Sequence, residues 1–265
     1  MRAPVDTIPA PPFLTHLWWV NVKSLRMERL VGKPVLIEFW DFCRPNSMRT
    51  LPYVKAWHER YAADGLQVVG IHSPGFEPAR ERAAAKAAVE RLEIAYPVLL
   101  DPDLEMWQVY ENQGWPARYL FDARGTLFDY HYGEGAYEET ELAIQELLGV
   151  EREPLQPLRP EDEPGVNLEP QTEDQPGAYS GPYEAGAVWA VLAGEGVVRI
   201  GATGVAGEPG DPGERSYTAV ATELAVTHPG AYPLIEHQRH TAGVLDLEIG
   251  PGVVCHATCF TPGGA

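Results

Sequence analysis

The chain has 265 residues, of which 45% are hydrophobic, and its 38 acidic residues against 20 basic ones give a formal net charge of −18. This length accommodates two domains of ordinary size. The excess of acidic residues excludes nucleic acid as a partner, because a surface that follows phosphates needs a basic patch. No stretch of 18 consecutive apolar residues is present, so the sequence predicts no membrane span.

The first twelve residues hold one arginine and four prolines, without the apolar core and small-residue cleavage site of a secretory signal. We therefore expect a cytoplasmic protein. Three cysteines are too few for a disulfide framework. On one strand, Cys255 and Cys259 would share a face about 13 Å apart. That separation is too long for a disulfide, so we expect no bond between them.

Residues 35–40 form a short apolar run that is typical of a buried strand in a parallel sheet, and residues 66–71 form a second. Between them, residues 47–63 carry apolar side chains at helical spacing. Asn46 or Ser47 is the expected cap of this helix.

Further elements are expected up to residue 149, in the order helix, helix, hairpin, helix. They are a surface helix over 78–93, a short helix over 103–111, a hairpin over 119–132 and a closing helix over 138–148, which Gly149 ends. This order predicts a mixed sheet with helices on both faces.

The composition changes after residue 149. Residues 150–178 contain six prolines and eight acidic residues. Such a segment cannot bury enough surface to offset its chain entropy, which predicts an extended linker. From residue 179 onward glycine is abundant, and short strands are expected over 189–192, 197–200 and 245–249. The pattern predicts an all-β sandwich over 179–265.

Four segments, in order, carry a resemblance to a known family. They are FWDFCRPNSMRTLPY over 39–53, GIHSPGF over 70–76, WPARYLFD over 115–122 and GEGAYEETE over 133–141. Through these segments, residues 9–148 resemble the DipZ/TlpA-type thioredoxin-like proteins of the AhpC/TSA-redoxin superfamily, which predicts a thioredoxin-like domain over 1–149. The resemblance implies an α/β thioredoxin-like fold, with a mixed sheet flanked by helices, and thiol–disulfide oxidoreductase activity.

The C-terminal region adds a second resemblance. Its segments AYPLI, IGPGV and FTPG are similar to the β-sandwich module that follows the thioredoxin domain in DipZ-type proteins, a jelly-roll-like fold related to carbohydrate-binding modules. This implies a carbohydrate as a candidate partner. Tyr179, Tyr183 and Trp189 would then form a stacking platform for a sugar, although core aromatic residues are the favoured interpretation.

The family's chemistry needs C-x-x-C at the start of a helix, where the first thiol loses its proton and attacks a disulfide. Counting back from residues 49–52, and forward from Phe39, places the two cysteine positions at Arg44 and Ser47. Cys43 lies one residue before the motif. Neither aligned position can form a thiolate, so the sequence predicts that dithiol exchange is lost.

Cys43 leaves two alternatives open. As a monothiol beside Arg44, near a helix N-terminus, it would form mixed disulfides or a sulfenic acid. As a small, partly buried residue it would be inert, which is the favoured interpretation.

Other residues are implicated by the family resemblance or by spacing. Trp115 and Pro116 match the family's cis-proline, which implies a groove for a protein or peptide partner beside Arg44. His72 follows a buried strand, and is either held by local hydrogen bonds or lines a pocket. Glu134 lies in a glycine turn, where a structural role is favoured.

The sequence shows one H-x-x-H pair, His237 and His240. Outside a helix this spacing favours a solvated loop over a metal site. Nothing in the sequence requires a metal or another cofactor. Three hypotheses for function remain: a redox-inactive or weakly active binding scaffold, a monothiol oxidoreductase that uses Cys43, and a carbohydrate-binding protein that uses the C-terminal domain.

Overall fold

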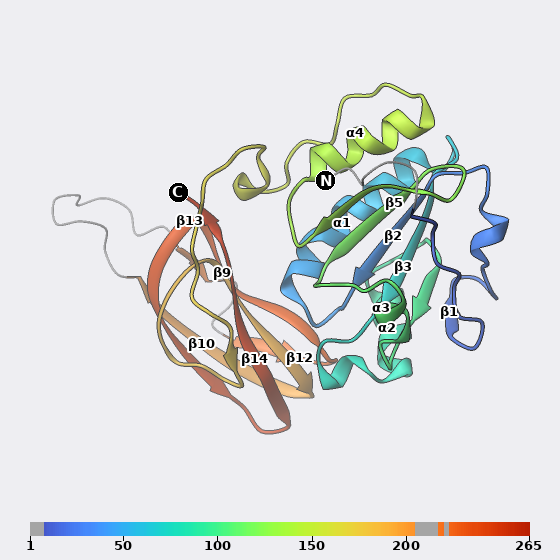
Figure 1. Ribbon diagram of the computed structural model, residues 1–265. Coiled ribbons are helices and arrows are strands. Elements are labelled where there is room, and N and C mark those ends of the chain that lie inside the picture. The colour runs from blue at the N-terminus through green and yellow to red at the C-terminus, as the bar shows by residue number, and fades with distance from the viewer. Residues whose placement is uncertain (1–7, 205–216, 220–222) are drawn as a thin grey trace. The chain divides into compact units, whose positions relative to one another are not determined.

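A computed structural model describes residues 8–204, 217–219 and 223–265 (Figure 1). The chain divides into two compact units, Met1–Gln156 and Pro157–Ala265. None of the helices within the described ranges has the length and hydrophobicity that crossing a membrane requires.

The N-terminal unit is built on a six-stranded mixed sheet with the order β1-β4-β3-β2-β5-β6. Strands β2, β3 and β4 are parallel to one another, while β1, β5 and β6 run antiparallel to their neighbours. The strands are β1 (Trp18–Val20), β2 (Val35–Trp40), β3 (Gln67–His72), β4 (Val98–Leu100), β5 (Ala117–Phe121) and β6 (Leu127–Tyr132). The predicted mixed α/β class is confirmed, and β2 has the expected bounds.

The two faces of this sheet are covered by different elements. Met106 and Tyr110, at the short helix α3, pack into an apolar cluster with Phe39 on one face. On the other face, the guanidinium of Arg118 lies over rings of α1 and α4. The helices are α1 (Pro45–Tyr61), α2 (Arg82–Arg91), α3 (Glu105–Val109) and α4 (Tyr137–Leu148), with 3-10 turns η1 (Met27–Arg29) and η2 (Glu77–Ala79).

Helix α1 begins earlier than the sequence predicts. The N-cap position is occupied by Arg44, not by Asn46 or Ser47. The side chain of Arg44 forms no capping hydrogen bond. Pro45 stands at the first helical position, where its fixed φ suits the helix and its missing N–H costs nothing. The hydroxyl of Ser47 accepts a hydrogen bond from the backbone N–H of Asp41 (3.2 Å) instead of capping the helix.

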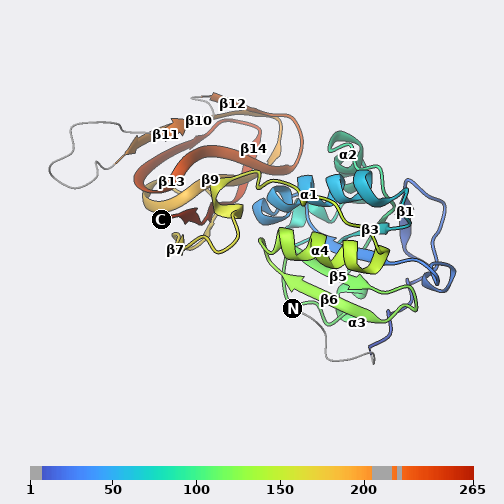
Figure 2. The same cartoon turned by 90° about the horizontal axis from the view of Figure 1, so that it is seen from above.

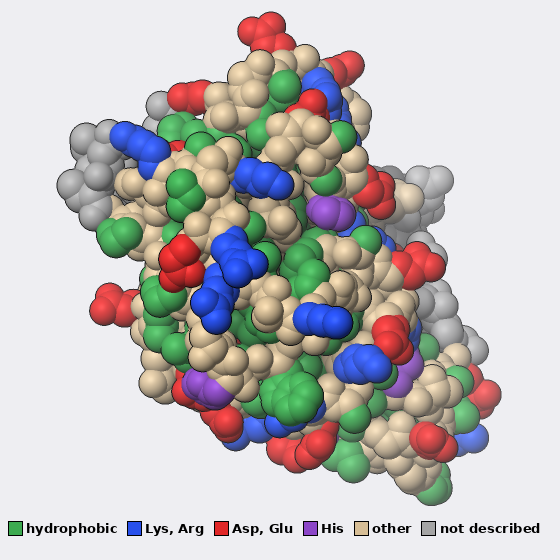
Figure 3. All heavy atoms as spheres, turned by 90° about the vertical axis from the view of Figure 1, so that its right-hand side faces the viewer, with side chains coloured by type: hydrophobic (Ala, Val, Ile, Leu, Met, Phe, Trp, Pro, Cys, Tyr) green, Lys and Arg blue, Asp and Glu red, His purple; other side chains and the backbone are tan. Residues whose placement is uncertain are grey.

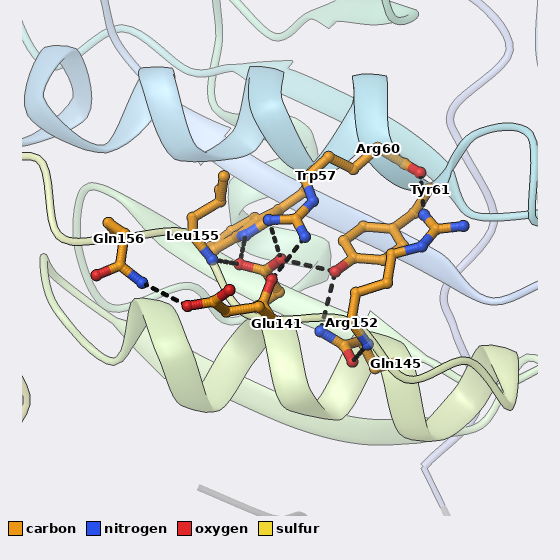
Figure 4. A network of polar contacts seen from close by, with 9 residues as sticks. Trp57, Arg60, Tyr61, Glu141, Gln145, Arg152, Leu155 and Gln156 are labelled. Carbon is orange, nitrogen blue, oxygen red and sulfur yellow. Dashed lines mark hydrogen bonds and ion pairs between the residues drawn. The ribbon is translucent and has the colours of Figure 1, made fainter.

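A buried carboxylate joins α1 to α4 (Figure 4). Glu141 of α4 accepts hydrogen bonds from the indole of Trp57 (3.2 Å) and the hydroxyl of Tyr61 (2.6 Å), and pairs with Arg60 (3.0 Å). It also accepts a hydrogen bond from the backbone N–H of Leu155 (2.8 Å). One side chain thereby ties two helices to the segment that follows them.

The segment 150–178, for which an extended linker is expected, makes specific contacts. Arg152 donates its backbone N–H to Gln145 (2.8 Å) and forms an ion pair with Asp64 (2.8 Å) within the N-terminal unit. Further along, this segment contributes a 3-10 turn and two short strands to the C-terminal unit. They are η3 (Pro160–Asp162), β7 (Leu168–Glu169) and β8 (Gln175–Pro176). The segment lacks aliphatic clusters, and strand pairing supports its backbone at β7 and β8.

The C-terminal unit is all-β, as predicted. Its seven-stranded sheet has the order β12-β10-β13-β9-β14-β8, with β11 paired to β13, and β7 and β15 form a separate ribbon. The long strands β13 and β9 bend around an apolar core (Figure 2). The remaining strands are β9 (Gly181–Gly194), β10 (Gly196–Gly204), β11 (Tyr217–Ala219), β12 (Glu223–Val226), β13 (Gly230–Ile249), β14 (Val253–Thr261) and β15 (Gly263–Gly264).

A bulge in β14 changes the expected arrangement of its two cysteines. The register of β14 against β9 shifts between Cys255 and Ala257. Cys255 pairs with Leu192, a residue of the core face, whereas Cys259 pairs with Trp189, which alternates with that face. The thiols therefore lie on opposite faces instead of one, and none of the three cysteines forms a disulfide.

Candidate functional site

The candidate site lies at the carboxyl edge of the N-terminal sheet. Trp40, His72 and Leu100 end three parallel strands and stand side by side in register. The loops that follow these strands therefore meet at one edge, which is where ligands bind in open α/β sheets. These loops carry the residues that the sequence analysis singled out.

Arg44 is held between two aromatic rings. Its guanidinium carbon lies 4.7 Å from the ring centre of Phe76 and 4.6 Å from that of Trp115. A Cβ at Gly75 would lie 2.7 Å from Nε of Arg44, so only glycine leaves room for this side chain. Among the described residues, no carboxylate pairs with the guanidinium, and its buried Nε has no hydrogen-bond partner. The site therefore presents a positive charge that pairs with no carboxylate of the described part of the chain.

Trp115 and Pro116 form the neighbouring wall. The peptide bond between them is cis. The indole N–H of Trp115 donates to the carbonyl of Ser73 (2.7 Å), and its ring stacks at an angle on Trp107, with 4.1 Å between ring centres. These contacts fix the ring that faces Arg44.

Cys43 lies beneath this surface. Its side chain is fully buried, and its backbone N–H donates to Oδ1 of Asp41 (2.8 Å). The other carboxylate oxygen of Asp41 accepts from the backbone N–H of Gly75 (2.8 Å). Asp41 thus links the start of α1 to the loop after β3 and holds Cys43 away from solvent. Asp41 is not among the predicted site residues, although a polar residue directly after a buried strand is a recognisable signal.

His72 is buried at the same edge. Its ring stacks on Phe42 (5.1 Å between centres), and its Nε2 lies 3.7 Å from Oδ1 of Asp41. Its Nε2 makes no hydrogen bond with the described residues. His72 is therefore almost completely buried, and it packs against Phe42 and Asp41.

Asp101 organises the next loop. It accepts hydrogen bonds from the hydroxyl of Ser73 (2.8 Å) and from the backbone N–H groups of Met106 (2.9 Å) and Trp107 (3.0 Å). Burial raises the pKa of this carboxyl, and the hydrogen bonds oppose that shift. Asp101 thereby positions Trp107, on which Trp115 stacks.

A second buried carboxyl, Glu38, lies on β2 opposite Arg118. Burial raises its pKa to about 8, and the charge of Arg118 only partly offsets this. Neither oxygen of Glu38 has a hydrogen-bond partner among the described residues. Glu38 therefore holds a proton in the folded protein up to neutral pH.

Most of the remaining predicted residues contact neighbouring side chains within their own unit. Glu134 pairs with the buried Arg49 of α1 (2.8 Å). His237 and His240 lie on β13, not in a solvated loop, and His237 forms a hydrogen bond with Tyr183 (3.0 Å). No group of three metal-ligating side chains is present in the described stretches of the chain.

The three aromatic residues considered for sugar stacking do not form one platform. Tyr183 is buried in the core of the C-terminal unit, and Tyr179 packs against that core. Trp189 is buried, and it lies on the opposite face of β9 from the core residues Val188 and Ala190.

The sheet order, the helices on both faces and the loop edge define a thioredoxin-like fold for the N-terminal unit. Residues 9–129 match the model of the AhpC/TSA family. In its N-terminal half the chain is similar to the solved thioredoxin-like superfamily protein SPOA0173, with a TM-score of 0.50 and 25% identity, covering 54% of this chain and 97% of that chain. The N-terminal unit thus has a thioredoxin-like fold, and most of it is similar to the AhpC/TSA family.

Two curated relatives extend this finding. The chain is 36% identical to Protein DipZ of Mycobacterium bovis over 177 residues, which is 65% of this chain and 25% of that protein. It is 29% identical to the thiol-disulfide oxidoreductase YkuV of Bacillus subtilis over 141 residues, which is 53% of this chain and 94% of that protein. The chain therefore spans about a quarter of the length of the DipZ relatives it matches.

Proposed function

We propose that the N-terminal unit is a binding domain on a thioredoxin scaffold that has lost dithiol chemistry. We infer that the half-buried side chains of Arg44, Phe76 and Trp115, with Pro116 behind them, form a groove at the carboxyl edge that takes a peptide or a segment of a partner protein. One observation carries the proposal: at the start of α1, where a nucleophilic thiol would stand, Arg44 is clamped between two rings and has no carboxylate partner among the described residues.

The burial of Cys43 supports this function over the monothiol alternative. A thiol must reach its substrate disulfide, and reactive cysteines are at least partly exposed. Cys43 is fully buried, and its backbone N–H donates to the buried carboxylate of Asp41. No observation favours the carbohydrate alternative over the others.

A gain-of-function experiment tests the loss of redox chemistry. The wild type and the double variant Arg44→Cys/Ser47→Cys are compared in an insulin-reduction assay with dithiothreitol, and Cys43→Ser serves as a control. We expect no rate above background for the wild type and Cys43→Ser, and a clear rate for the double variant. Wild-type activity that disappears in Cys43→Ser would overturn the proposal in favour of the monothiol.

Ligand selection tests the groove. A random peptide library is selected on the full chain, and the recovered peptides are measured against Arg44→Ala and against Arg239→Ala, which removes an exposed arginine from the other unit. We expect at least a tenfold loss of affinity for Arg44→Ala only. Peptides that bind all three proteins equally would show that the groove is not the binding site.

A further inference from the structure

A second surface of the N-terminal unit lies around strand β1, next to the end of β4, and includes none of Arg44, Phe76, Trp115 and Pro116. A groove of about 750 Å³ is lined there by Trp18, Arg80, Arg82, Lys86 and Leu100, among others. Trp18 is 58% exposed, which is unusual for so large an apolar side chain. The guanidinium of Arg82 lies over its ring, 4.3 Å from the ring centre.

The positive charges of this groove are only weakly neutralised. Arg80 and Arg82 have no carboxylate partner within the described ranges, although Glu81 and Asp103 also line the groove. Lys86 has only an exposed contact with Glu90 (3.5 Å). Figure 3 shows several Lys and Arg side chains across the middle of one face of the molecule, with hydrophobic side chains and some Asp and Glu side chains beside them.

The distribution of charge along the chain makes this surface distinctive. Residues 1–91 contain 13 basic and 9 acidic residues, a net charge of +4, and residues 92–265 contain 7 and 29, a net charge of −22. The two sums give the −18 of the whole chain. The protein as a whole is strongly negative, so a cationic groove on its surface favours the binding of an anionic ligand over a cationic one.

The backbone of β1 adds a second mode of recognition. β1 is the edge strand of the six-stranded sheet, paired only with β4 through Trp18–Leu100, Trp19–Leu99 and Val20–Val98. Its other edge offers unpaired N–H and C=O groups in the described structure. An extended peptide adds to such an edge through main-chain hydrogen bonds, and side-chain pockets supply the specificity.

We propose that this groove binds an extended, acidic segment of a partner protein. The segment pairs with the free edge of β1, its carboxylates face Arg80, Arg82 and Lys86, and an apolar side chain packs on Trp18. This site is separate from the Arg44 groove, so either proposal can fail without the other.

The experiment measures fluorescence anisotropy of a labelled ten-residue peptide of alternating glutamate and valine with the full chain at 20 mM salt. We expect saturable binding that weakens at least tenfold in Arg82→Glu and at least fivefold in Trp18→Ala. Arg239→Glu, which makes the same charge change on the other unit, should bind as the wild type does. Circular dichroism and thermal unfolding establish that each variant is folded.

Two further ligands, a backbone-methylated peptide and inorganic phosphate, test which part of the peptide is recognised. A peptide whose alternate backbone amides are methylated cannot pair with β1, and it should bind at least tenfold more weakly. Binding of the methylated peptide equal to that of the parent would overturn strand pairing. No peptide binding up to 1 mM, or binding of inorganic phosphate alone, would overturn the proposal as a whole.

Discussion

The guanidinium of Arg44 is stabilised by ring faces instead of a carboxylate, which leaves its charge available to a ligand. Cation–π contacts of this kind contribute about 0.5–2 kcal/mol each. Both rings depend on neighbours: Trp115 is fixed by Ser73 and Trp107, and Gly75 leaves the space that the guanidinium fills. The geometry at this single residue therefore depends on three loops.

The substitution Gly75→Ala tests this dependence. Its Cβ would displace the guanidinium of Arg44 from between the rings, so we expect a loss of about 1 kcal/mol in the free energy of unfolding. In an Arg44→Ala background the same substitution should cost almost nothing. Denaturant unfolding of the four proteins gives the coupling energy, and equal costs in both backgrounds would contradict the contact.

Glu38 predicts a pH dependence of stability. The unfolded chain releases this proton near pH 4.5, whereas the folded protein keeps it up to about pH 8. Because the folded state binds more protons in this window, its stability falls as pH rises from about 4.5 to 8, by at most about 1.4 kcal/mol per pH unit.

In Glu38→Gln, which resembles the protonated form, the decline should be shallower. Thermal unfolding between pH 5 and 8.5 measures it, with Glu28→Gln as an exposed control. Identical slopes for the wild type and Glu38→Gln would exclude Glu38 as the titrating group.

At the scale of elements, the contact between α1 and α4 depends on one carboxylate. Glu141 satisfies donors from Trp57, Tyr61, Arg60 and Leu155 (Figure 4). Removing this buried acceptor leaves the indole N–H of Trp57 and the backbone N–H of Leu155 without this partner, and each incurs a desolvation cost, whereas Arg60 keeps its bond to the carbonyl of Glu153.

We expect Glu141→Ala to lower the free energy of unfolding by about 3–5 kcal/mol. Glu138→Ala, an exposed residue on the same helix, should change it by less than about 0.5 kcal/mol. Chemical denaturation of both variants measures the difference. A small effect of Glu141→Ala would mean that water replaces the lost acceptor.

At the scale of the whole molecule, each unit has its own apolar core. The N-terminal unit ends at Gln156, beyond the last helix. Its final residues belong to the fold, because Leu155 bonds Glu141 and Arg152 bonds Gln145 and Asp64. The boundary at residue 149, expected from the sequence, cuts through these contacts.

Two fragments test this boundary. Both 1–149 and 1–156 retain the sheet and its helices, and 1–149 lacks the contacts of Arg152 and Leu155. We expect the shorter fragment to be less stable by about 1–3 kcal/mol in urea unfolding. Equal stability of the two fragments would place the boundary at residue 149.

The sequence by itself determined the classes of both units, most element positions in the first 149 residues and the absence of thiols at residues 44 and 47. Apolar periodicity and short turn signals are local, so one sequence suffices to find them. The edge strand β1 is only three residues long and left no such local signal, and neither did the end of the compact N-terminal unit at Gln156.

Only the tertiary structure decided what surrounds the site. The guanidinium of Arg44 lies between the rings of Phe76 and Trp115, which follow it in the sequence by 32 and 71 positions. Cys43 is buried where Asp41 links the start of α1 to the loop at Gly75. The bulge in β14 places Cys259 on the opposite face of the sheet from Cys255, because one extra residue shifts every later side chain to the other face. Such contacts arise from how distant segments pack, and local sequence patterns do not encode that packing.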